Sequence, residues 1–403
     1  MHSIEGDLTY QAYSQHGEFN NSISRLELNK LLLTKAEQAG VAVKFGWELD
    51  SLDMTAPTRP AAVFTATPTD NGTGNKVGST LNLDARFVIG SDGGGSRVRN
   101  ALSAAGAVKF SEEMLSHGYK EMPFPSKSGP GKAGEYTMDS DSLHIWPRGE
   151  HMLMALANTD GSFTGTIYLA NEGGASSFAQ LDTKERVLAF FKDQYPDAIP
   201  VLGGEDVVVS TFMGNPVGIL GTVRADKYHF GSPQGGSSVL IIGDAAHAIV
   251  PFFGQGCNCG FEDVRILAEL IDGAGGKMTE AVCSEFTTAR KTNADAIADL
   301  ALDNFDEMQR RTGLDSFILH KGVEGVLEEK LEEKFRSRYQ MVTYTTIPYR
   351  TCLEAGDVIQ EIIETLSEGL TDPANVDLKQ AEALLDTKLM PFLRSKGVES
   401  LNF

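Results

Sequence analysis

Residues 238–272 read SVLIIGDAAHAIVPFFGQGCNCGFEDVRILAELID, and the order of residue types in this stretch decides the fold. Val239–Ile242 is a short apolar run that predicts a buried strand, and the turn Gly243-Asp244 follows it directly. Glycines return at 254, 256 and 260, and from Phe261 the apolar residues take helical spacing. The stretch therefore predicts a strand, an acidic turn, a glycine-rich loop and a helix that begins near Phe261.

This order of elements suits a phosphate-bearing or otherwise electron-rich ligand. The first turn of a helix offers unpaired N–H donors and the positive end of the helix dipole, and glycine lets the backbone approach a ligand closely. A carboxylate such as Asp244, placed straight after a strand, can accept hydrogen bonds from ribose or ribityl hydroxyls. The alternative is a plain strand-loop-helix connection that needs glycine only for its turns.

A second junction of the same kind occurs earlier in the chain. Phe87–Gly90 is an apolar run, and Ser91-Asp92-Gly93 leads through two further glycines and a basic segment into the next helix. One such junction is weak evidence. Two in one chain point to a dinucleotide that lies across the ends of the strands.

Composition limits the partners. The net charge of −20 over 403 residues argues against nucleic acids and anionic membranes, because both require clustered lysine and arginine. No apolar run of about 18 residues is present, so we expect no membrane-spanning helix. The 4 cysteines form no disulfide framework, which indicates a reducing compartment and a cytoplasmic protein. Cys257, Cys259 and His247 lack a fourth ligand and the usual zinc-site spacing, so we expect no metal.

The other segments alternate between helical and strand patterns, which is typical of an α/β protein. Ser24-Arg25-Leu26-Glu27 fits a capping box that opens a helix ending at Gly40, and Val41–Phe45 then alternates as a strand. Residues 54–80 predict a strand with long turns. From about residue 123 to 220, period-2 segments predict an antiparallel sheet, interrupted by a helix around Lys184–Gln194. Helices are predicted beyond that in residues 294–309, 317–338, 358–366 and 384–389.

The two junctions resemble a known family. GSDGGGSRVR at 90–99 and GDAAHAIVPFFGQGCNCGFED at 243–263 are similar to the paired FAD-contacting motifs of the single-component (class A) FAD-dependent aromatic hydroxylases. Within that family the chain most resembles the members that act on L-kynurenine. The similarity runs in order from Met1 to about Tyr349 and fades beyond. Supporting segments are HS at 2–3, SISR at 22–25, HGY at 117–119, LHIWPRG at 143–149, YPDAIP at 195–200, NPVG at 215–218 and YQMVTY at 339–344.

The resemblance implies a fold and a reaction. The fold would be a Rossmann-like, three-layer FAD-binding domain with an inserted antiparallel β domain for the substrate and C-terminal helices. Its expected parts are residues 1–122 and 221–290 for the FAD-binding domain, 123–220 for the substrate domain and 291–403 for the helices. NADPH would reduce FAD, O2 would add to the flavin as a hydroperoxide, and one oxygen would pass to the ring of kynurenine. We therefore expect no catalytic triad, since such chemistry mainly requires that water be excluded.

Site residues follow from the resemblance position by position. Those expected to contact the cofactor are Arg25, Asp92, Gly93, Arg99, Gly243, Asp244, Gly254, Gln255, Gly256, Cys257 and Asn258. Among them, Asp244 would bind the ribityl chain and the loop from 254 to 258 would lie at the pyrimidine edge of the flavin. Arg99 would help to dock NADPH. The alternative for Arg25 is an ordinary solvated residue in the first turn of a helix.

The substrate would be held by a second set of residues. The resemblance implies that Tyr13, Asn304 and Tyr339 hold its carboxylate and that Pro251 and Phe252 form an apolar wall, with Phe212 and Met308 as neighbours. The alternative for each of these last four side chains, which the residue types alone favour, is plain core. The polar trio distinguishes kynurenine from a simple phenol, because an apolar substrate would require no polar groups there.

The chain also departs from the family pattern. The family carries an initial βαβ unit with GxGxxG and an arginine for the substrate carboxylate, and this chain shows neither. We expect an N-terminally incomplete version of a working monooxygenase. The alternatives are a hydroxylase for another aromatic ring, or a non-catalytic chain that lacks the GxGxxG unit.

Overall fold

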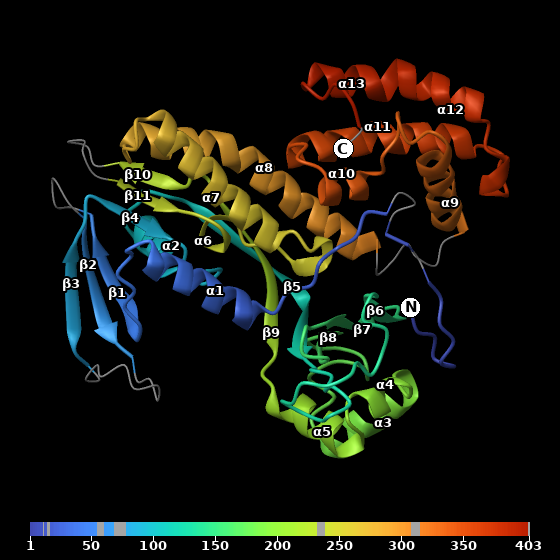
Figure 1. The fold of residues 1–403 in the computed structure, drawn as a ribbon, viewed down its shortest axis with the longest axis horizontal. Coiled ribbons are helices and arrows are strands. Elements are labelled where there is room, and N and C mark those ends of the chain that lie inside the picture. The colour runs from blue at the N-terminus through green and yellow to red at the C-terminus, as the bar shows by residue number, and fades with distance from the viewer. Residues whose placement is uncertain are drawn as a thin grey trace. The chain divides into compact units, whose positions relative to one another are not determined.

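The structure is a computed structural model that describes residues 1–10, 12–13, 17–54, 60–67, 78–231, 238–307 and 315–401 (Figure 1). Its contacts divide the chain into two compact units. Unit 1 contains Met1–Val43 and Met114–Leu220. Unit 2 contains Lys44–Glu113, Gly221–Glu307 and the C-terminal segment Arg311–Phe403. Residues 1–43 thus group with the predicted substrate domain.

Unit 1 is built on an antiparallel sheet, as the period-2 segments predicted. Within the described residues the strand order is β6-β7-β8-β5-β9. Alternate residues of β7 and β8 are buried, so one face of the sheet carries the core. Helices α3 and α5 contribute Val187, Phe191, Val208 and Phe212 to that core. The strands are β6 (His144–Arg148), β7 (His151–Ala157), β8 (Phe163–Ala170), and β5 (Phe110–Glu121) and β9 (Gly218–Ala225), which each belong in part to unit 2. The helices are α3 (Lys184–Gln194), α4 (Ala198–Val201) and α5 (Glu205–Gly214).

Unit 1 also contains α1 (Arg25–Gln38), whose start was predicted correctly. The Ser24 hydroxyl accepts the Glu27 backbone N–H at 3.4 Å. The carboxylate of Glu27 pairs with Lys30. No residue of α1 is buried, and its exposed leucines are Leu26, Leu31, Leu32 and Leu33. The predicted strand at Val41–Phe45 was wrong, because Gly46 turns the chain and the strand begins at Trp47.

The centre of unit 2 is a pair of parallel strands, β4 (Phe87–Gly90) and β11 (Ser238–Ile241). Their register pairs Gly90 with Ile241, and the backbone N–H of Ile242 donates to the carbonyl of Gly90 at 3.0 Å. All four β11 residues are buried, as the apolar run predicted. The two acidic turns therefore leave adjacent strands at the same end. The antiparallel strand β10 (His229–Gly231) pairs with β11 on its other side.

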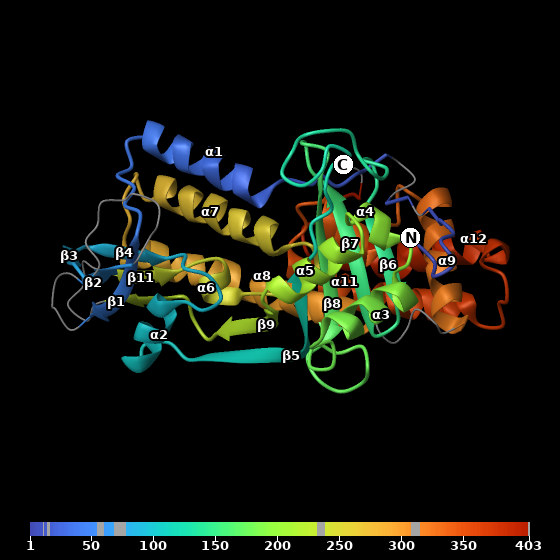
Figure 2. The same cartoon turned by 90° about the horizontal axis from the view of Figure 1, so that it is seen from below.

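A separate antiparallel sheet in unit 2 has the order β1-β2-β3 (Figure 2). Its strands are β1 (Trp47–Asp53), β2 (Ala61–Ala66) and β3 (Thr80–Asp84). The single strand predicted in residues 54–80 is β2. The remainder of that prediction falls largely on residues 55–59 and 68–77, outside the described part.

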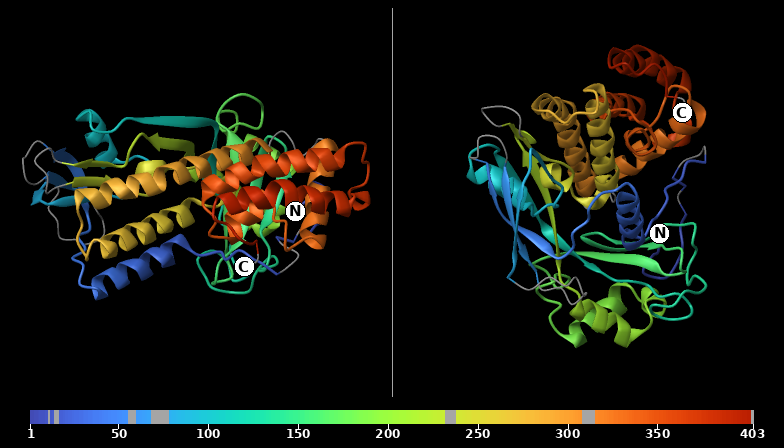
Figure 3. Two further views of the ribbon diagram at one scale, coloured as in Figure 1. Left: turned by 90° about the horizontal axis from the view of Figure 1, so that it is seen from above. Right: turned by 60° about the vertical axis from the view of Figure 1, so that its left-hand side comes forward.

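Helices complete unit 2 (Figure 3). The helix predicted at 294–309 is the end of a longer one, α8 (Glu280–Asp306), which packs along α7 (Gly256–Gly273). Helix α11 (Tyr349–Ser367) packs against α8 and is buried along one face. The other helices of this unit are α2 (Arg97–Ala104), α6 (Asp244–His247), α9 (Asp315–Lys330), α10 (Arg338–Tyr344), α12 (Leu378–Leu384) and α13 (Met390–Ser395). Among the described residues, no helix combines the length and the apolar character needed to cross a membrane.

Candidate functional site

The acidic turn after β11 presents one exposed carboxylate. Gly243 has φ 57° and ψ −144°, a backbone conformation that other residues rarely adopt, and it is followed by the short helix α6. Asp244 is exposed, whereas Ala245, Ala246 and His247 behind it are buried. The sequence therefore places the Asp244 carboxylate on the outer side of a buried turn.

The glycine-rich loop leads into the N-terminus of α7. Pro251–Phe253 forms a 3-10 turn that Gly254 ends with φ 67°. Helix α7 begins at Gly256, five residues before the predicted start near Phe261. None of the described side chains caps this 18-residue helix, and Cys257 and Asn258 in its first turn are exposed. Its first N–H groups thus offer the donors that an electron-rich ligand requires.

At the other junction, after β4, the acid Asp92 bonds to the backbone of the helix that follows it. Asp92 accepts the backbone N–H groups of Arg97 at 2.8 Å and Val98 at 3.2 Å, so its carboxylate caps α2. The adjoining Gly93 has φ 81° and leaves open space where a side chain would be. Because Asp92 is also exposed, these bonds leave it a predicted contact of the cofactor. Gly93 stays a predicted contact.

The prediction that Arg99 helps to dock NADPH is corrected. Its side chain is fully buried and donates to the carbonyl oxygens of Gly94 at 2.6 Å and Ala245 at 3.0 Å. It also pairs with Glu112 at 2.7 Å. Because its guanidinium holds the two acidic turns together, it has no exposed surface with which to dock NADPH.

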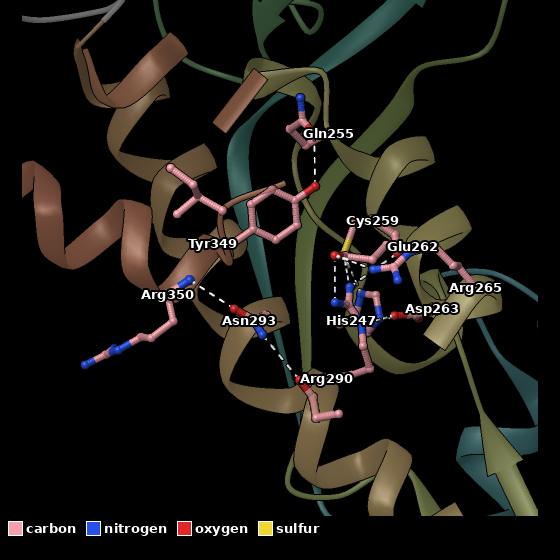
Figure 4. Close-up of polar contacts among 12 residues, drawn as sticks. His247, Gln255, Cys259, Glu262, Asp263, Arg265, Arg290, Asn293, Tyr349 and Arg350 are labelled. Atoms are coloured by element: carbon pink, nitrogen blue, oxygen red, sulfur yellow. Dashed lines mark hydrogen bonds and ion pairs between the residues drawn. The ribbon is translucent and has the colours of Figure 1, made fainter. Parts of the chain in front are cut away.

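A buried charged cluster lies behind the exposed turn (Figure 4). The Asp263 carboxylate accepts hydrogen bonds from the backbone N–H of Gly243 at 2.8 Å, from His247 Nε2 at 2.7 Å and from Arg290 Nε at 2.6 Å. Arg290 also pairs with Glu262 at 2.6 Å. The pairing of these residues was missed, because the charges lie on different helices and no local pattern joins them.

His247, Cys259 and Asp263 could also be considered as metal ligands. Their ligand atoms lie within 4.8 Å of one another. However, the Asp263 carboxylate already accepts three N–H groups, and the Arg290 guanidinium at 2.6 Å would repel a cation. Hydrogen bonding accounts for this cluster without an ion.

The cluster fixes the charge of its members. Burial alone would lower the pKa of His247, but the hydrogen bonds and charges of Asp263 and Cys259 together outweigh it and raise that pKa to about 10. Burial opposes ionisation of Asp263 as well, yet the hydrogen bond and charge of His247 hold the pKa of this carboxyl below its usual value. The pair is therefore an imidazolium and a carboxylate at neutral pH.

We expect this pair to make stability fall as the pH rises above neutral. The contribution of His247 is complete below its unfolded-state pKa of 6.5 and is lost as the pH rises through its folded-state pKa of about 10. The contribution of Asp263 to stability is complete above its unfolded-state pKa of 3.8, so it does not change above neutral pH. From about pH 7 to 9 the free energy of unfolding should drop by up to about 1.4 kcal/mol per pH unit. Urea unfolding of wild type and His247→Gln checks this, and parallel pH profiles would contradict it.

The predicted substrate residues of unit 2 converge on the loop before α7. The side-chain amide of Asn304, on α8, donates to the carbonyl of Phe252 at 2.7 Å. Tyr339, on α10, stacks on Phe253 with ring centroids 5.6 Å apart. Phe252 stacks on Phe305 at 4.4 Å. The loop thus presents aromatic rings beside an amide and a phenol, and Pro251 at its start is exposed.

The remaining predicted residues are placed differently. Phe212 lies in the core of unit 1, 1% exposed and packed against Phe191, which favours the plain-core alternative. Tyr13 lies in unit 1 and is half-buried. Arg25 is the exposed first residue of α1. Met308 lies outside the described residues.

A further contact ties the C-terminal helices to the loop. The Tyr349 hydroxyl, at the start of α11, donates to the side-chain oxygen of Gln255 at 2.9 Å (Figure 4). Gln255 is 4% exposed, so its side chain points inward while its backbone leads into α7. No local pattern predicts this role for Tyr349, because its partner is 94 residues away.

Comparisons with known proteins identify the family of this chain. Residues 5–301 match the family described as FAD binding domain. A kynurenine 3-monooxygenase of Myxococcus xanthus (strain DK1622) is 41% identical over 98% of this chain and 80% of its own. A kynurenine 3-monooxygenase of Dictyostelium discoideum is 35% identical over 96% of this chain and 81% of the Dictyostelium chain.

Solved structures support the fold alone. The tetrameric form of 2-methyl-3-hydroxypyridine-5-carboxylic acid oxygenase gives a TM-score of 0.52 at 18% identity, over 73% of this chain and 69% of that one. Klebsiella pneumoniae HpxO, complexed with FAD and uric acid, gives a TM-score of 0.51 at 16% identity. That match covers 85% of this chain and 71% of the HpxO chain.

Fold, site and relatives define an FAD-dependent flavoprotein monooxygenase of the aromatic hydroxylase class. The chain belongs to the kynurenine 3-monooxygenase family. The resemblance and the α/β fold class predicted from the sequence are thereby confirmed. The exposed Asp244, the uncapped first turn of α7 and the open space at Gly243 and Gly254 fit such a cofactor.

Proposed function

We propose that this protein hydroxylates L-kynurenine at the ring carbon next to its amino group, giving 3-hydroxykynurenine with NADPH and O2 as co-substrates. The observation that carries the proposal is the convergence of Asn304 and Tyr339 on the aromatic loop at Phe252-Phe253. An amino-acid substrate needs polar groups beside an aromatic wall, and that loop supplies both. The names of the relatives support the same substrate.

The residues of this chain would bind and orient FAD. Asp244 would accept hydrogen bonds from the ribityl chain of FAD, and the first turn of α7 would place N–H groups at the pyrimidine edge. Gly93, Gly254, Gly256, Cys257 and Asn258 are proposed contacts of the same cofactor, with Arg25 as a further one. FAD, when bound and reduced by NADPH, would supply the two electrons that activate O2. One atom of that O2 would enter the ring and the other would leave as water.

On the substrate side, Tyr13, Asn304 and Tyr339 would hold the carboxylate, and Pro251 and Phe252 would face the ring. The apolar wall would also keep water away from the reacting atoms. We further propose a reducing compartment such as the cytoplasm, because all four cysteines are free thiols.

A steady-state assay tests the proposal. Kynurenine should stimulate NADPH oxidation by the full-length protein and yield 3-hydroxykynurenine, whereas simple phenols should not. Stimulation by phenols alone would favour the second candidate, a hydroxylase for another aromatic ring. FAD binding without turnover of either would favour a non-catalytic protein.

We expect Asn304→Ala to raise KM for kynurenine about tenfold or more, with a much smaller change in kcat. A lost hydrogen bond to a charged group costs about 1.5–3 kcal/mol, and the Phe252 carbonyl also loses its donor. The dissociation constant for FAD should not change. Asn293→Ala, on the same helix, is the matched control, and an equal rise in KM there would contradict the assignment.

A further inference from the structure

Asp263 lies where three elements of unit 2 meet. It belongs to α7, and its fully buried carboxylate accepts one N–H from the turn after β11, one from α6 and one from α8 (Figure 4). Oδ2 accepts from both Gly243 and His247, and Oδ1 accepts from Arg290. Both oxygens are therefore committed to holding neighbouring elements.

Two of these elements, the turn after β11 and α7, carry groups that are proposed to bind the cofactor. The backbone N–H of Gly243 immediately precedes Asp244, and α7 carries the uncapped N-terminus. A single side chain on α7 that holds Gly243 at 2.8 Å fixes the spacing between the acidic turn and the first turn of that helix. Arg290 at 2.6 Å restrains the same carboxylate from α8.

We propose that Asp263 is a positioning residue for the cofactor, setting the separation of Asp244 from the N-terminus of α7. This inference rests on the proposed FAD site. Asp263 acts through Gly243 and α7 and touches neither the cofactor nor the substrate. Its role is more than that of an ion pair, because one of its three contacts is with the neutral backbone N–H of Gly243.

Asparagine is an informative replacement for this aspartate. It has nearly the same shape, but one of its two terminal atoms is a donor, while all three neighbours of Asp263 are donors. The amide nitrogen must therefore face an N–H, and the turn or α8 must move. Glu262 is the matched control, because it is the adjacent acid on α7 and also pairs with Arg290.

The test is titration of the full-length apoprotein with FAD, followed by flavin fluorescence and visible circular dichroism. We expect Asp263→Asn to raise the dissociation constant at least tenfold and to change the flavin dichroism. Glu262→Gln should change the constant less than twofold. In wild type the constant should be flat between about pH 6 and 8, whereas in Asp263→Asn it should vary with pH, because His247 has lost the carboxylate that keeps it charged.

Asp263→Glu is a second variant in case Asp263→Asn does not fold. It retains the charge and moves the carboxylate by one methylene. A tenfold loss of affinity in either folded variant supports the proposal. Wild-type affinity in a folded Asp263→Asn protein overturns it, and so does failure of both variants to fold, which would assign Asp263 to folding alone. If the wild type itself bound no FAD, the proposed function would fail instead.

Discussion

Replacing Asp244 with alanine is expected to weaken FAD binding about 100-fold while leaving the protein folded. The side chain is exposed at the turn after β11, so its removal leaves no buried cavity. Hydrogen bonds from ligand hydroxyls to a carboxylate contribute about 1.5–3 kcal/mol each, and every 1.4 kcal/mol is a tenfold change in affinity. Fluorescence titration of the apoprotein measures the change directly.

The matched control is Asp272→Ala, an equally exposed aspartate near the C-terminal end of α7. It removes the same charge from the same unit, so a general electrostatic effect would appear in both variants. Wild-type affinity in Asp244→Ala, or an equal loss in Asp272→Ala, would remove Asp244 from the site.

The second large effect is expected from Arg99→Ala, which should lower the free energy of unfolding by about 3 kcal/mol or more. Its guanidinium satisfies the carbonyls of Gly94 and Ala245, and a buried partner left alone costs about 1–3 kcal/mol. The partly exposed Glu112 can regain water and adds less. Urea unfolding followed by circular dichroism gives the difference.

Arg97→Ala provides the comparison on the same helix. Arg97 is half exposed and pairs with the half-exposed Glu48, so its loss should cost below about 1 kcal/mol. If the two variants were equally stable, or if Arg99→Ala raised KM for NADPH at unchanged stability, Arg99 would return to the role of a docking residue.

Local signals in the sequence were sufficient for the strands and turns of the site. The apolar run at Val239–Ile242 and the acid and glycine that follow it are consecutive residues, and their order specifies a buried strand and a tight turn. The start of α7 could not be placed from periodicity. Its first turn consists of small and polar residues, and the apolar pattern begins only at Phe261.

Long-range contacts explain where the sequence was insufficient. An arginine or aspartate next to a glycine turn has the same pattern whether it faces a ligand or the interior. The direction of Arg99 is set by Ala245, 146 residues away. Asp263 and Arg290 are 27 residues apart on different helices, so their pairing depends on how those helices pack.

The uncapped start of α7 has a consequence for the life of the protein in a cell. A helix of 18 residues without a capping side chain leaves polar backbone groups unsatisfied, and a bound FAD would satisfy them. A ligand that binds only the folded state stabilises it in proportion to the logarithm of its concentration. Cells short of FAD should therefore hold less of this protein, because the unliganded form unfolds and is degraded more often, and flavin supply would set enzyme abundance as well as activity.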